Sequence, residues 1–106
     1  MACEQPTHST IIPNYPARTL VAHWWYEGNS HRGFILELYR KMGDPPVWTR
    51  VDVRTTFRAG RKYTFRKMHM GDGQVWKVRI TTQCENCTLS ATDESDEVTL
   101  TFPTPD

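Results

Sequence analysis

The chain has 106 residues, of which 38% are hydrophobic and 24% are charged, and its formal net charge is +1. This length suits one domain with one hydrophobic core. We expect the domain to span residues 1–106, with its folded part within about residues 6–103 and the termini as linkers. A net charge this small argues against general nucleic-acid binding, and no segment approaches the roughly 20 apolar residues of a transmembrane helix, so we expect neither nucleic-acid binding nor membrane insertion.

The N-terminal half contains segments rich in β-branched and aromatic residues, separated by turn-forming residues. Proline ends the first of them, which is typical of a strand at a sheet edge. The Met-Gly-Asp-Pro-Pro cluster at residues 42–46, between the third and the fourth of these segments, predicts a hairpin turn. We therefore predict strands over residues 10–12, 19–25, 33–40 and 48–53.

Two of these strands require a choice between alternatives. In residues 19–25 we expect Leu20, Ala22 and Trp24 to face the core, because the other register would bury a histidine whose ring nitrogens need polar partners. Residues 33–40 contain good helix formers, but the entry glycine and the prolines that follow favour a strand. Its inward positions would be Phe34, Leu36 and Leu38.

The clearest alternation in the chain lies in residues 73–82. Trp76, Val78 and Ile80 occupy one face and Lys77 and Arg79 the other, which predicts a half-buried central strand. Shorter strands are expected at 62–66 and 98–102, with a long polar loop from 83 to about 96. Seven strands and no helix predict an all-β fold, a seven-stranded antiparallel β-sandwich.

The order of these landmarks resembles that of a fibronectin type III domain over roughly residues 6–103. The landmarks are Trp24, the Gly33–Leu38 strand, Trp48, the Trp76–Ile80 strand and the final Val98–Thr101 segment before proline. The resemblance implies a fibronectin type III or immunoglobulin-like sandwich. In that family a tyrosine usually stands where this chain has Trp76 and makes a corner hydrogen bond, so the resemblance implies a different corner here.

Cys84 and Cys87 have the two-residue spacing of redox motifs and of half a zinc site. A redox pair requires a helix N-terminus, whereas this pair follows a predicted sandwich strand beside acidic residues. A zinc site requires four ligands, and the remaining candidates are Cys3 and four scattered histidines. We favour a disulfide between Cys84 and Cys87, with Cys3 as an alternative partner, and expect no metal and no cofactor.

Asn86, within Asn86-Cys87-Thr88, is a candidate for N-linked glycosylation. Because glycosylation and disulfide formation both belong to the secretory pathway, the two signals together favour an extracellular or cell-surface location.

A basic cluster follows in the middle of the chain, within a stretch whose only acidic residue is Asp52. Strand positions two apart share a face, so we expect Arg50 and Arg54 to align, and we place Lys77 and Arg79 on the opposite sheet. The cluster would bind a sulfated glycan or an acidic protein surface, as cationic patches do in the resembled family; the alternative is an ordinary solvated face. Its members are Arg50, Arg54, Arg58, Arg61, Lys62, Arg66 and Lys67.

The chain also has more aromatic residues than one core needs, and we expect Trp25, Tyr26 and Tyr39 to be exposed. Exposed aromatic residues suit a protein interface or contact with a neighbouring domain of the same chain. We find no catalytic arrangement of residues and expect no enzyme. The leading hypothesis is an extracellular interaction or adhesion module of a larger receptor, adhesion or matrix protein; the alternatives are a structural spacer and an intracellular interaction module.

Overall fold

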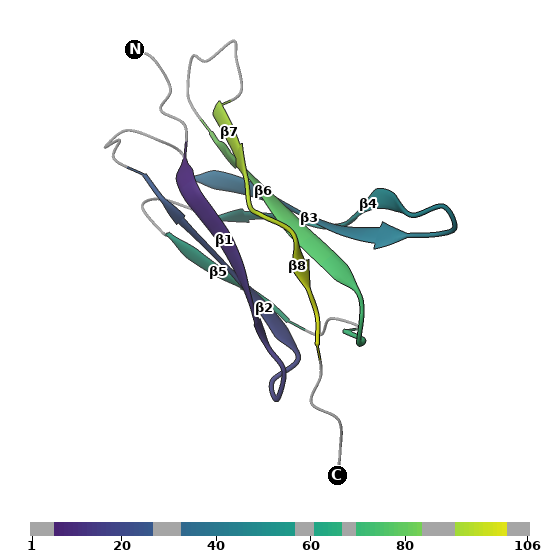
Figure 1. The fold of residues 1–106 in the computed structure, drawn as a ribbon. Coiled ribbons are helices and arrows are strands. Elements are labelled where there is room, and N and C mark those ends of the chain that lie inside the picture. Colours follow the sequence, from purple (N-terminus) through teal and green to yellow (C-terminus); the bar gives the residue numbers. More distant parts are fainter. Residues whose placement is uncertain (1–5, 27–32, 57–60, 67–69, 84–90, 102–106) are drawn as a thin grey trace.

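A computed structural model describes residues 6–26, 33–56, 61–66, 70–83 and 91–101. These residues form β-strands and no helix (Figure 1). None of the described residues belongs to a helix long and apolar enough to cross a membrane. The strands are β1 (Thr7–Asn14), β2 (Thr19–Trp25), β3 (Phe34–Met42), β4 (Val47–Thr56), β5 (Lys62–Phe65), β6 (Val75–Thr82), β7 (Ala91–Glu94) and β8 (Val98–Thr99).

The strands form two antiparallel sheets, as expected for the predicted all-β sandwich. One sheet has three strands in the order β1-β2-β5. The other has five strands, in the order β4-β3-β6-β7, with β8 also paired to β6. Figure 1 shows the two layers, with the β3–β4 hairpin projecting beyond the three-stranded sheet.

Strand β6 is central, as predicted, because it pairs with β3 on one side and with β7 and β8 on the other. Trp76, Val78 and Ile80 are at most 1% exposed, while the residues between them are half-buried. The indole N–H of Trp76 donates to Gln74 Oε1 at 3.2 Å, and the Gly71 N–H donates to the same oxygen at 2.8 Å. The side chain of Gln74 thus joins the start of β6 to the turn before it.

The final part of the chain differs from the prediction. The expected loop over residues 83–96 contains β7, so the described residues form eight strands, whereas seven were predicted. Polar pairs hold β7 to β6: the hydroxyls of Thr81 and Thr92 are hydrogen-bonded at 2.9 Å, and Arg79 pairs with Glu94 at 3.3 Å. Because polar pairs hold β7 in place, its sequence lacks the apolar alternation on which the prediction of strands depended.

Residues 95–97 separate β7 from β8, and the register with β6 shifts by one residue across them. The N–H of Ser95 donates to the Val78 carbonyl at 2.9 Å, and its hydroxyl oxygen accepts the Val78 N–H at 2.9 Å. Both main-chain groups of Val78 are thus satisfied across the bulge, although the site is buried.

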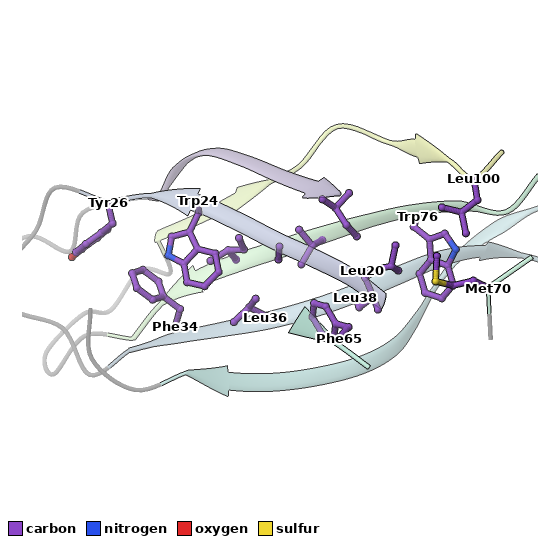
Figure 2. Close-up of a cluster of buried hydrophobic side chains, with 14 residues drawn as sticks. Leu20, Trp24, Tyr26, Phe34, Leu36, Leu38, Phe65, Met70, Trp76 and Leu100 are labelled. Carbon is purple, nitrogen blue, oxygen red and sulfur yellow. The ribbon is translucent and has the colours of Figure 1, made fainter. Parts of the chain in front are cut away.

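The core lies between the sheets and follows the predicted registers of β2 and β3. Figure 2 shows Trp24, Tyr26 and Phe34 together at one end and Trp76 with Met70 and Leu100 at the other. The rings of Trp24 and Phe34 meet edge to face with centroids 5.1 Å apart. Burying each large apolar side chain contributes about 1.5–3 kcal/mol. The fully buried residues between the two ends include Leu20, Leu36, Leu38, Phe65, Val78 and Ile80.

Candidate binding groove between two edge strands

The two sides of the sandwich are closed differently. On one side the Ser9 N–H of β1 donates to Asp93 Oδ2 of β7 at 3.2 Å, which links the two sheets. On the other side β5 and β4, each the edge strand of its own sheet, face an open groove of about 510 Å³. We call this the β4–β5 groove; it is lined by Asp52, Arg54, Lys62, Tyr63, Thr64, Phe65 and Arg66.

The groove is positively charged, because its lining contains three cationic side chains and only one carboxylate. Arg54 Nε donates to Asp52 Oδ2 at 3.1 Å, and this hydrogen bond, with the charge of the carboxylate, raises the pKa of Arg54 above its ordinary value. Lys62 and Arg66 are exposed, and neither makes an ion pair with any residue that the structure describes. Two cations therefore remain available to an anionic ligand.

Two aromatic residues, Tyr63 and Phe65, are among the lining of the groove. Phe65 is buried, and the half-buried ring of Tyr63 meets it edge to face with centroids 5.0 Å apart. A ligand in the groove would thus contact the half-buried Tyr63 as well as the cationic side chains.

The expected alignment of Arg50 with Arg54 is wrong. Arg50 pairs with Tyr39 and donates to Glu37 Oε2 at 3.2 Å on the outer face of the five-stranded sheet. Arg54 pairs with the buried Leu36 and so faces the groove. The register shifts between Leu38 and Tyr39, which leaves Val51 as an extra residue in β4, and an extra residue reverses the side on which later side chains lie.

Arg61 also lies away from the lining. Its Nη2 donates to the Tyr26 carbonyl at 2.9 Å, and its guanidinium lies 5.3 Å from the centre of the Tyr26 ring and 5.9 Å from that of Phe34. Arg61 therefore stabilises the end of the core. Of the predicted cluster, the groove gathers Arg54, Lys62 and Arg66, whereas Arg58 and Lys67 lie outside the described residues.

Lys77 and Arg79 were expected on the sheet opposite the basic cluster. They lie on the sheet opposite Lys62 of β5, but they share the five-stranded sheet with Arg50 and Arg54, because β6 and β4 flank β3. They stack on aromatic rings of the outer face of this sheet: Lys77 Nζ lies 4.6 Å from the Trp48 ring centre, and the Arg79 guanidinium lies 5.3 Å from that of Tyr39. Glu37 and Glu94 balance these charges through the ion pairs Arg79–Glu37, Arg79–Glu94 and Lys77–Glu94. The charges of this face are mostly compensated within the chain.

The three aromatic residues expected to be exposed have different environments. Tyr26 is only 5% exposed, so that expectation is wrong; its ring packs edge to face on Phe34, with centroids 5.2 Å apart. Tyr39 is half-buried, and burial followed by the nearby Glu37 raises the pKa of its hydroxyl. Trp25 is 57% exposed, at the end of β2.

The remaining candidate residues, Cys84, Asn86 and Cys87, lie outside the described residues. Within the described ranges, no group of three or more histidine, cysteine, aspartate or glutamate side chains is placed to hold a metal ion. Comparison with protein-family models, with curated proteins and with solved structures found no match. The geometry of the groove is thus the basis for assigning a function.

Proposed function

We propose that this chain is a non-enzymatic binding module that takes a polyanionic partner in the β4–β5 groove. The observation that carries the proposal is that Lys62 and Arg66 lie beside Arg54 without a carboxylate partner of their own among the described residues. A ligand that meets an unpaired cation does not have to displace an existing ion pair. Electrostatic attraction acts over about 8 Å at physiological ionic strength, so the ligand must enter the groove to interact with the charges of Arg54, Lys62 and Arg66 together.

We further propose that the module has a fibronectin type III or immunoglobulin-like fold and belongs to an extracellular receptor, adhesion or matrix protein. Support for the fold comes from the division of strands, with β1, β2 and β5 in one sheet and β3, β4, β6 and β7 in the other. The tryptophans of the resemblance lie on β2, β4 and β6. The extracellular location is supported by the sequence of residues 84–88.

The test compares two variants that lose the same charge from different surfaces. The groove variant changes Arg54, Lys62 and Arg66 to Ser; the control variant changes Lys41, Arg50 and Arg79 to Ser on the outer face of the five-stranded sheet. Exposed ion pairs are each worth about 0.2–1 kcal/mol, so we expect the groove variant to weaken heparin binding roughly 3- to 150-fold, and the control much less.

Equal weakening in both variants would mean that only general charge is involved, and the proposal would fail. Failure of the wild-type chain to bind heparin or acidic peptides at low salt would also contradict it and would favour the second candidate, a structural spacer. Circular dichroism of each variant establishes that the fold is intact, since exposed charges contribute little to stability.

A further inference from the structure

The edge of β5 that faces the groove has main-chain groups without hydrogen-bond partners among the residues that the structure describes. The Trp24 N–H donates to the Arg61 carbonyl at 3.1 Å, which fixes the side of the chain that faces β2. Because hydrogen bonding alternates along an antiparallel strand, Tyr63 and Phe65 continue this pattern and the main-chain groups of Lys62 and Thr64 point away from β2. No loop or side chain within the described residues bonds to the main-chain N–H or C=O groups of Lys62 and Thr64.

The opposing edge, on β4, is less accessible to another strand. The extra residue Val51 interrupts its regular spacing. The Val53 N–H already donates to Asp52 Oδ1 at 2.9 Å. Bulges are among the devices by which proteins prevent strands from adding to an edge, and a side chain that occupies a main-chain donor has a similar effect. Of the two edges at the groove, β5 is therefore the one with a regular, unoccupied row of donors and acceptors.

We propose that the groove binds an extended acidic peptide, which adds to β5 as a fourth strand of the three-stranded sheet. This inference rests on the proposed function and specifies its ligand. A polypeptide main chain supplies alternating donors and acceptors at the spacing of Lys62 and Thr64, whereas the sulfates of a glycan only accept hydrogen bonds and its hydroxyls do not follow the spacing of a strand. The row of donors and acceptors thus favours a peptide, and the cations favour an acidic one.

The side chains of the groove define which peptide fits. Lys62 and Thr64 pair with His23 and Val21 and so point to the outer face of their sheet, whereas Tyr63 and Phe65 point inward. A bound strand alternates in the same way, so acidic residues at every second position meet Lys62 and Arg66 on one face. The residues between them meet the ring of Tyr63, which favours apolar side chains there. From Lys62 to Arg66 is about 13 Å, the length of a five-residue segment.

The probes are synthetic nine-residue peptides in which Glu alternates with Val. One is unmodified, one is N-methylated at the odd positions and one at the even positions. N-methylation removes main-chain donors from one edge of the peptide and retains its charge. If the peptide adds as a strand, one methylated form loses at least tenfold in affinity relative to the other, because only one edge of the peptide pairs with β5.

The matched protein variants are Thr64→Pro and Thr64→Ala. Proline removes the main-chain donor that faces the groove and is tolerated on edge strands, whereas alanine retains this donor. We expect Thr64→Pro to lose at least tenfold in peptide affinity while its retention on heparin is preserved, and Thr64→Ala to bind the peptide like the wild type. Amide hydrogen exchange at Lys62 and Thr64 should slow when the unmodified peptide binds.

The outcomes separate this inference from the proposed function. Peptide binding that depends on Arg54, Lys62 and Arg66 but is equal for both methylated peptides would overturn strand addition and leave a groove that binds by charge alone. Binding of heparin but of none of the peptides would assign the groove to glycans. If the wild-type chain binds neither heparin nor any of the acidic peptides, both proposals are contradicted. If Thr64→Pro fails to fold, the comparison of methylated peptides on the wild-type chain decides.

Discussion

Arg50 and Arg54 lie four positions apart on β4 and face opposite sides of the five-stranded sheet. The extra residue Val51 between them is responsible. As a result, Arg50 joins the outer face through Glu37, while Arg54 joins Lys62 and Arg66 across the β4–β5 groove. A cluster that is continuous in sequence is thus divided between a compensated surface and a cationic one.

The first prediction concerns the core. Trp76 is 1% exposed, and its replacement by alanine should reduce the free energy of unfolding by about 3–5 kcal/mol, the usual effect of deleting a buried large aromatic side chain. Chemical denaturation measures this loss. The control is Trp48→Ala. The Trp48 ring is only half-buried on the outer face, so its removal should reduce the free energy of unfolding clearly less. Equal losses would contradict the central place of β6 in the core.

The second prediction concerns the bulge between β7 and β8. Ser95→Ala removes the hydroxyl that accepts the buried Val78 N–H at 2.9 Å. An unsatisfied buried donor costs about 1–3 kcal/mol, so the free energy of unfolding should fall by that amount. Thr99→Ala, at an exposed position of β8, should change it by no more than about 0.5 kcal/mol. A Ser95→Ala protein as stable as the wild type would show that this hydrogen bond is dispensable.

The third prediction concerns alkaline pH. Burial and the neighbouring Glu37 raise the pKa of Tyr39 above its ordinary value of 10.0. The folded chain therefore keeps a proton that the unfolded chain releases, so this contribution to stability is complete below pH 10 and falls as the pH rises through the higher pKa. Tyr39→Phe should remove this part of the pH dependence. Denaturation midpoints of the two proteins across this range test the prediction, and parallel curves would contradict it.

The fourth prediction concerns the extracellular location. In material secreted from eukaryotic cells, we expect Cys84 and Cys87 to be oxidised and Asn86 to carry a glycan. Reduction should then add the mass of two hydrogens, and Asn86→Gln should remove the glycan mass. Thr88→Ala, which abolishes the acceptor sequence without changing Asn86, is the matched control. Free thiols at both cysteines, together with an unmodified Asn86, would favour the intracellular alternative.

Much of the fold was predictable because apolar residues recur at every second position in β2, β3 and β6. The burial of Tyr26 follows from the same alternation, since it lies two positions after Trp24, although we expected it to be exposed. Strand β7 could not be found in this way, because Thr92 and Glu94 are held by polar partners on β6.

The site was less predictable because it depends on contacts between distant segments. Composition identified Arg54, Lys62 and Arg66 as cationic, but only the pairing of β5 with β2 and of β4 with β3 brings them to one groove. The bulge at Val51 has no signature in the local sequence, as valine is ordinary in a regular strand. The shared sheet of Arg79 and Arg50 likewise depends on β3 lying between β4 and β6.

The central position of β6 has a consequence for the order of folding. The β1–β2 and β3–β4 hairpins are local and can form within about 1–10 μs, but each presents apolar side chains that only the other sheet covers. Strand β6 joins β3 in the second sheet, and its last residue comes roughly 26 residues after the end of β4, which a ribosome adds in about 1–5 s. During synthesis, both hairpins can form long before β6 is available, and the apolar side chains of β3 that β6 will help to cover stay accessible in that interval, which exposes the nascent chain to aggregation.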